Sequence, residues 1–490
     1  MPFTAELTYR TLPPLFYQTV APTPVAAPAW LLFNDALANQ LQWPQDARQT
    51  PLGLQYFSGN QLAPWMQPTA SAYTGHQFGS LAPRLGDGRA LLLTEVLSAQ
   101  GARFDVQLKG AGPTPFSRRG DGRAALGPVL REYLISEWMA AVGVRTSRAL
   151  AAVTTGETIY RDTRVPGAVL TRVAASHIRI GTFQYASVHG TRADVKALAD
   201  YVIARHYPAL QHDAQPYLAL LRAVATAQAD LIAHWMSLGF VHGVMNTDNM
   251  TVSGETIDYG PCAFIDGFDP SACFSSIDSQ GRYAYRNQPP IAQWNLARLA
   301  ESLLVLLHDD EQQAIAAAMT VLNDFPALYQ AARLKRFAAK LGLQSPVVTD
   351  LALIDDLLTL LSQQQIDFTL FFRELSRPAT TPGAQAGLLF AEPAAFSAWQ
   401  QRWLQRLAAA ALDPAAELDP AALSQQLLQA NPAFIPRNFR IEQIIDSALN
   451  GDLGPAQAFA KASLTPFADD AYWAQLPPAS FCNYQTFCGT

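Results

Sequence analysis

The sequence predicts an α+β protein in which a β-rich first part precedes a large helical part. Between about residues 85 and 190, short β-compatible runs alternate with glycine-rich connections. After about residue 190, apolar residues recur at helical spacing in long segments rich in Ala and Leu. Strands followed by helices, rather than regularly alternating with them, indicate an α+β architecture.

The first part begins with residues 1–60, which are rich in proline and aromatic residues and only weakly periodic, so we expect an irregular extension with short helices. The runs "RALLLTEVL" and "RFDVQLKG" predict two strands, and Phe104, Val106 and Leu108 alternate onto one face of the second. A glycine-rich connection then leads to a predicted helix, "PVLREYLISEWMAAVG", which has proline in its first turn and glycine at its end. Three further strand-like pieces follow: "RALAAVTT", "ETIYRD" and "PGAVLTRVA".

The second part is predicted to be helical almost to its end. Helical spacing is clearest in "ADVKALADYVIARHY", "PYLALLRAVATAQADLIAHWMSLG", "QWNLARLAESLLVLLH", "EQQAIAAAMTVLNDF" and "DLALIDDLLTLLSQQQ". We therefore expect an N-terminal extension over 1–60, a β-containing lobe over 61–190 and a helical lobe over 191–490.

Composition excludes several classes of protein. Of the 490 residues, 49% are hydrophobic and only 15% are charged, with a formal net charge of −6, which disfavours a general nucleic-acid binder. No apolar segment is long enough to span a bilayer, and the first residues resemble neither a secretory signal nor a transit peptide. We expect a cytoplasmic protein, monomeric, with no nucleic-acid or membrane partner.

One segment is basic within this acidic chain. From Arg84 to Arg179 there are 14 Lys and Arg against 8 Asp and Glu, whereas the remaining residues carry 20 basic and 32 acidic side chains. This local excess of positive charge favours a site for an anionic ligand. The four cysteines include no CxxC pair, which argues against a structural zinc site.

The motifs point to phosphate chemistry. Lys109 ends a predicted strand and Glu132 lies on the helix that follows, the order in which protein kinases place a phosphate-binding lysine and its partner. Asn249 lies seven residues after His242, and Asp258, in "IDYGP", lies nine residues after Asn249. This resembles the kinase catalytic loop and metal-binding motif, so Asn249 and Asp258 are candidate Mg²⁺ ligands.

The same loop lacks the usual kinase base. Val244 occupies the position of the catalytic aspartate, and valine cannot accept a proton. Asp248, next to Asn249, is the candidate replacement if the acceptor hydroxyl approaches from another direction.

Four long stretches are similar to the selenoprotein O (YdiU) family: "GDGRALLLTEV", "DVQLKGAGPTPFSRRGDGRAALGPVLREYLISEWM", "TRVAASHIRIGTFQ" and "HGVMNTDNM…TIDYGPCAFIDGFDP". The resemblance covers nearly the whole chain, starting at "YTGHQFGS". It implies a two-lobed, protein-kinase-like (pseudokinase) fold and transfer of AMP from ATP to Ser, Thr or Tyr hydroxyls of other proteins. Some members are described as using UTP with Mn²⁺, so UMP transfer is a second expectation.

The resemblance also implies roles for individual residues. Asp248 matches the proton acceptor, Asn249 and Asp258 match the metal ligands, and Glu132 matches the partner of the lysine. The positions matching nucleotide contacts are Gly86, Gly88, Arg89, Lys109, Asp121, Gly122, Arg172, Arg179 and Asp258. For Asp121, the sequence leaves open whether an arginine or the base is its partner.

A kinase-like cleft, as the resemblance implies, would allow attack at the α-phosphorus if ATP bound in the reverse of the usual kinase sense, with its γ-phosphate end buried. Arg172 and Arg179 are the expected cations for that end. Family members also carry Cys or selenocysteine very near the C-terminus, a place that Cys488 holds here. We therefore consider a reversible disulfide between Cys273 and Cys488, with two free thiols as the alternative.

Two other functions stay open at this point. A true phosphotransferase would use Asp248 with the γ-phosphate, and an inactive scaffold would bind partners without catalysis. The retention of Lys109, Asp248, Asn249 and Asp258 argues against the scaffold, since a scaffold needs no metal ligands. A dinucleotide-binding fold is disfavoured because "GDGR" does not open a helix after a strand.

Overall fold

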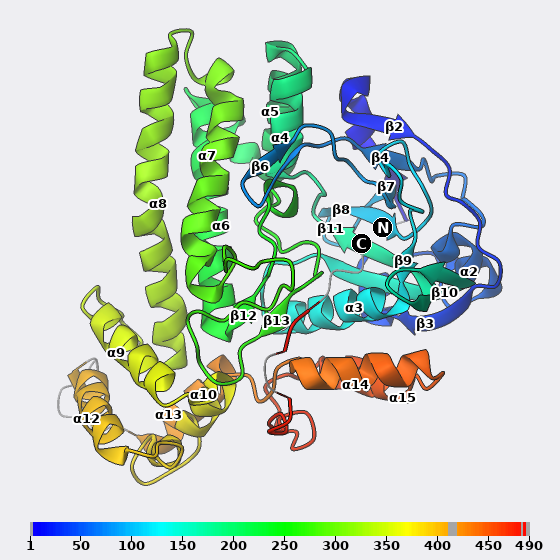
Figure 1. Ribbon diagram of the computed structural model, residues 1–490. Coiled ribbons are helices and arrows are strands. Elements are labelled where there is room, and N and C mark those ends of the chain that lie inside the picture. The colour runs from blue at the N-terminus through cyan, green and yellow to red at the C-terminus, as the bar shows by residue number, and fades with distance from the viewer. Residues whose placement is uncertain (1–2, 410–418, 482–483, 487–490) are drawn as a thin grey trace.

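The computed structural model describes residues 3–409, 419–481 and 484–486. It is a mixed α and β structure in which one large sheet and a group of long helices lie on opposite sides (Figure 1). This confirms the predicted order, strands first and helices after.

The strands form three sheets within the described residues. Their bounds are β1 Ala5–Glu6, β2 Tyr17–Thr19, β3 Ala29–Phe33, β4 Thr69–Ser71, β5 Gly75–Gln77, β6 Ser80–Ala82, β7 Ala90–Leu97, β8 Arg103–Lys109, β9 Ala124–Ala125, β10 Arg148–Tyr160, β11 Arg164–Ala174, β12 Phe240–Val241 and β13 Ala263–Phe264. The largest sheet has nine strands in the order β2-β4-β7-β8-β11-β10-β3, with β1 beside β7 and β9 beside β11. The pairs β5–β6 and β12–β13 are separate two-stranded sheets.

Alternation of side chains builds a core on each face of the large sheet. Leu91 and Leu93 of β7 pack with the aromatic residues of the N-terminal region, whereas Leu92 between them faces the other core. Val106 and Leu108 of β8 lie on one face as the sequence predicts. Both faces are therefore covered, and β8 and β11 lie side by side in the middle of the sheet.

The helices are α1 Asp35–Gln40, α2 Pro51–Ser58, α3 Leu126–Ala141, α4 Ile180–His189, α5 Arg192–His206, α6 Pro216–Leu238, α7 Gln288–Leu307, α8 Glu311–Lys340, α9 Asp350–Gln363, α10 Phe368–Leu375, α11 Ala384–Gly387, α12 Pro393–Ala409, α13 Pro420–Ala430, α14 Asn438–Leu449 and α15 Gly454–Ala462. Helix α3 packs on β10 and β11, and α14 and α15 pack on its opposite side (Figure 1). The long helices α6, α7 and α8 pack on one another.

Residues 1–60 differ from the irregular extension expected from their composition. Strands β1, β2 and β3 all join the nine-stranded sheet, and β3 forms its edge beside β10. These strands are short, two to five residues, which is why no periodicity marks them. None of the helices in the described part of the chain combines the length and apolar character required to cross a membrane.

Candidate active site

A cavity of about 1010 Å³ contains almost all of the predicted site residues. Its walls come from the loops before β7 and β9, from β8 and β11, from the start of α4 and from the segment 244–261. The predicted residues that line it are Gly86, Gly88, Arg89, Lys109, Asp121, Gly122, Arg172, Arg179, Asp248, Asn249 and Asp258. Five aspartates and eight Lys or Arg residues line it in all, so this cleft is positive within an acidic protein.

Lys109 lies between two carboxylates at the end of β8. Its Nζ is 2.6 Å from Glu132 Oε2 on α3 and 2.6 Å from Asp258 Oδ1. Glu132 is buried beneath the cleft and does not line it. The predicted lysine–glutamate pair is therefore formed between β8 and α3, the helix that packs on the sheet.

Arg172 of β11, the strand next to β8, and Arg179 at the start of α4 lie beside the same aspartate. Arg172 Nη1 is 2.8 Å from Asp258 Oδ1, and its Nη2 donates to Gln107 Oε1 at 2.9 Å. Arg179 Nη2 is 3.6 Å from Asp258 Oδ2. Both guanidinium groups are almost fully buried, so each needs an anionic partner to offset the free-energy cost of removing its charge from water.

Asp258 is held in an unusual state by this cluster. Burial alone would raise the pKa of its carboxyl, but Arg172, Lys109 and Arg179 together hold that pKa well below its usual range. The backbone of Asp258 is left-handed, with φ of 61°. A non-glycine residue in this region is uncommon and is typically found at functional sites.

Two of the predicted glycines are required by the backbone itself. Gly86 has φ of 103°, and a Cβ on it would lie 2.4 Å from the Phe116 ring. Gly122 has φ of 67°, and a Cβ there would lie 2.1 Å from the carbonyl carbon of Gly112. Any side chain at either position would displace the loops that form the rim of the cleft.

The partner of Asp121 is an arginine that the sequence did not identify. Arg161 reaches both carboxylate oxygens, with Nη1–Oδ2 at 2.9 Å and Nη2–Oδ1 at 3.0 Å. The hydrogen bond from Arg161 is the main cause that lowers the pKa of Asp121. Arg89, in contrast, forms no salt bridge to a carboxylate in the described part of the chain.

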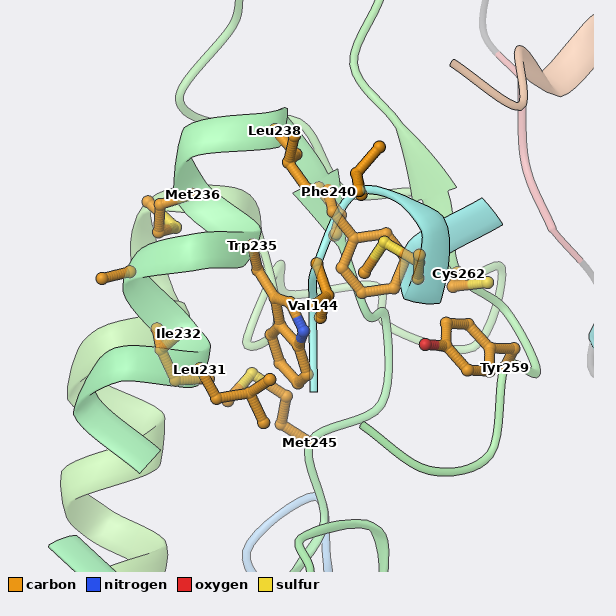
Figure 2. Close-up of a cluster of buried hydrophobic side chains, with 14 of the residues drawn as sticks. Val144, Leu231, Ile232, Trp235, Met236, Leu238, Phe240, Met245, Tyr259 and Cys262 are labelled. Atoms are coloured by element: carbon orange, nitrogen blue, oxygen red, sulfur yellow. The ribbon is translucent and has the colours of Figure 1, made fainter. Parts of the chain in front are cut away.

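The segment that carries Asp248 is built on a buried aromatic core. Trp235 of α6 contacts His242 with 5.3 Å between ring centroids, and Figure 2 shows its indole among Val144, Leu231 and Met245. His242 is fully buried, and burial lowers its pKa. Its Nδ1 accepts from Val244 N–H, and its Nε2 donates to Ile257 O at 2.9 Å. Thus His242 ties the loop to the residue before Asp258.

Asp248 and Asn249 are neighbours in the short 3₁₀ turn Thr247–Asn249. Asp248 is 9% exposed, and burial raises the pKa of its carboxyl to about 6. Its Oδ1 has no hydrogen-bond partner among the described residues. Asn249 Nδ2 donates to Val244 O at 3.1 Å, which orients the amide and leaves its Oδ1 as the atom free to bind a cation.

Two residues of the site carried no assigned role in the sequence analysis. Asp87, between the two predicted glycines, accepts from Arg179 Nη1 at 3.2 Å and from Ser71 N–H at 3.0 Å. Tyr73 places its ring 4.3 Å from the Arg179 guanidinium carbon. The position of Asp87 inside "GDGR" was a usable signal, whereas nothing near Tyr73 in the sequence points to Arg179.

Of the two cysteines in the predicted pair, only Cys273 lies among the described residues. Cys273 is partly buried, with Sγ 3.3 Å from Asp278 Oδ2, and burial raises the pKa of its thiol to about 11. Cys488 lies outside the described residues. The disulfide therefore stays a prediction.

Comparison with known proteins identifies the family. A family model described as "Protein adenylyltransferase SelO" matches residues 3–463. Proteins named "Protein nucleotidyltransferase YdiU" are 53% identical in Rhodopseudomonas palustris and 50% identical in Rhizobium rhizogenes, and each alignment covers 100% of this chain and 99% and 97% of the relative. A protein of the same name from Methylorubrum populi is 50% identical, over 100% of this chain and 99% of its own. The chain belongs to the SelO family of protein adenylyltransferases.

Proposed function

We propose that this protein transfers the AMP group of ATP to Ser, Thr or Tyr hydroxyls of other proteins, within a two-lobed, protein-kinase-like cleft. Membership of the family supports the nucleotidyltransferase activity and a protein as acceptor. In this proposal residues 61–190 form the β-containing lobe, to whose sheet residues 1–60 add the strands β1, β2 and β3, and residues 191–490 form the helical lobe. The enzyme acts as a monomer and needs no nucleic acid.

The observation that carries the proposal is the buried cluster of Lys109, Arg172 and Arg179 at the inner end of the cleft. In an ordinary kinase that inner region receives an apolar adenine ring. Three cations are instead suited to the phosphate oxygens of a triphosphate. An ATP molecule bound in the reverse sense would leave its α-phosphorus near Asp248.

In the chemical step, the hydroxyl oxygen of the acceptor attacks the α-phosphorus. The bond between that phosphorus and the oxygen bridging to the β-phosphorus breaks, and pyrophosphate leaves. Asp248 accepts the proton of the hydroxyl, for which a pKa raised to about 6 is suitable. Lys109, Arg172 and Arg179 stabilise the negative charge that accumulates on the leaving group.

The side chains of Asn249 and Asp258 fit a divalent cation. Both offer hard oxygen donors, and the Asn249 amide is oriented through its Nδ2. Among the described residues no group of three or more His, Cys, Asp or Glu could hold a metal alone, so the remaining ligands would be phosphate oxygens and water. When bound, Mg²⁺ or Mn²⁺ would neutralise phosphate charge.

The decisive experiment is incubation with a protein acceptor and ATP labelled separately at the α- and γ-phosphates. We expect label on protein only from the α position, with an added mass equal to AMP. Transfer from the γ position alone would establish a phosphotransferase, and no transfer from either, with nucleotide bound, would favour a scaffold. A parallel reaction with α-labelled UTP measures the preference between AMP and UMP transfer.

Arg89 offers a test of nucleotide binding that leaves the fold intact. Its side chain lines the cleft, is half-buried and has no carboxylate partner among the described residues. We expect Arg89→Ala to raise KM for ATP about tenfold, or ~1.4 kcal/mol, because one charge-assisted contact is lost. The melting temperature should not change. Arg84→Ala is the matched control, since Arg84 is exposed and does not line the cleft. An equal effect of both variants on KM would contradict the assignment.

A further inference from the structure

The hairpin β5–β6 contacts the loop that carries Asp248. It belongs to neither the large sheet nor the helical core, and its first strand lies against the 3₁₀ turn Thr247–Asn249. His76 N–H donates to Thr247 Oγ1 at 2.8 Å, and Phe78 N–H donates to Asn246 Oδ1 at 3.2 Å. Backbone groups of the hairpin thus fix the two side chains that immediately precede Asp248.

Helix α4 completes this attachment. Gln184 donates from Nε2 to His76 Nδ1 at 2.7 Å and accepts from Thr247 Oγ1 at 2.6 Å. The hairpin, the loop and α4 are therefore linked through one buried amide. The same helix begins directly after Arg179, so the position of the loop is coupled to the cation cluster.

Gly75, the first residue of the hairpin, leaves the space that the Asp248 carboxylate occupies. A Cβ at Gly75 would lie 2.2 Å from Asp248 Oδ1 and 2.7 Å from its Cγ. On the other side, a Cβ at Gly181 of α4 would lie 3.4 Å from Asp248 Cα. Gly75 is not in the left-handed region, so the glycine is required here for space and not for backbone conformation.

We propose that the hairpin Gly75–Ala82 is a positioning device for Asp248, and that Gly75 is the positioning residue that sets where the carboxylate points. The inference rests on the proposed function, in which Asp248 accepts the proton. A substitution at Gly75 should therefore change kcat and leave KM for ATP unchanged, because Gly75 does not contact Lys109, Arg172 or Arg179.

The test is Gly75→Ala. The added methyl group meets the Asp248 carboxylate and Leu85 Cδ1, both ends of side chains, so the carboxylate turns away while the backbone stays. We expect kcat for transfer of α-label to fall about 10- to 100-fold, the usual cost of displacing a catalytic group by about 1 Å. KM for ATP and the melting temperature should equal those of the wild type. Gly454→Ala is the matched control, because its Cβ would approach a carboxylate oxygen of Asp452 at 3.0 Å away from the cleft.

A double-mutant cycle gives the second readout. In an Asp248→Ala background the carboxylate is absent, so adding Gly75→Ala should cause no further loss of the residual rate. An equal loss in both backgrounds, an unchanged kcat in the single variant, or a loss explained by weaker ATP binding or a lower melting temperature would each overturn the proposal. If the wild type transfers γ-label instead, the proposed function fails, but the same cycle still measures the coupling of Gly75 to Asp248.

Discussion

Asp258→Asn is expected to lower kcat for AMP transfer by about 10³-fold while leaving ATP binding intact. The substitution preserves volume but removes the charge that Lys109, Arg172 and Arg179 share, and it removes one of the two proposed cation ligands. Loss of one preorganised electrostatic group at a reacting centre typically costs about 10²–10³-fold, and a displaced cation adds to this. The measurement is the rate of α-label transfer at saturating ATP.

The cation cluster also predicts how this variant responds to its substrate. Without the carboxylate, three cations face one another in a buried site, so the free protein should melt at a lower temperature. ATP supplies the missing negative charge and should recover most of that loss. Chelation of divalent ions should bring the wild type to the rate of the variant and leave the variant unchanged.

The control for Asp258→Asn is Asp230→Asn. Asp230 also pairs with an arginine, Arg336 at 2.8 Å, but outside the cleft. Its substitution should leave kcat unchanged. If Asp258→Asn keeps the wild-type kcat, or if its only effect is on KM for ATP, the proposed role of Asp258 as a cation ligand is wrong.

The fold was predictable where periodicity was long and local. Strands β7 and β8 and helix α3 were identified within a few residues because their apolar positions and terminal Pro and Gly residues are unambiguous. The first two of the three pieces predicted after α3, "RALAAVTT" and "ETIYRD", are one strand, β10, with a register shift around Gly156, whose φ is 69°. A glycine that marks a bulge was interpreted as a break between strands.

Helix α8 shows where local rules fail. The sequence predicts a helix that ends at Phe325, before Pro326, but α8 continues through the proline to Lys340. Proline removes one backbone hydrogen bond, a cost of about 3 kcal/mol in a helix interior. Burial of Phe325, Tyr329 and Phe337 on both sides of Pro326 offsets that cost, and this packing is not visible in the sequence.

The site was predictable as a set of residues but not as a geometry. Spacing along the chain identified His242, Asn249 and Asp258 because these residues share one segment. The contacts of Tyr73 with Arg179 and of Gly75 with Asp248 join residues more than 100 positions apart. No local pattern records such contacts, so the sequence could indicate which residues act but not what orients them.

Asp248→Asn tests the role of Asp248 as the base separately from ATP binding and from stability. Asparagine keeps the shape of the side chain but cannot accept the proton of the attacking hydroxyl, so we expect kcat to fall by about 10²–10⁴-fold. KM for ATP should not rise, because among the described residues Asp248 forms no salt bridge with Lys109, Arg172 or Arg179. The melting temperature should be equal or higher, since a buried carboxylate is removed. Transfer of α-label and binding of ATP are measured on the same preparation.

Asp200→Asn is the control, because Asp200 is exposed and pairs with Lys196. A variant that keeps wild-type kcat would show that another group accepts the proton, whereas a variant that loses ATP binding would place Asp248 among the nucleotide contacts. Only a loss confined to kcat is consistent with Asp248 as the acceptor of the proton of the attacking hydroxyl.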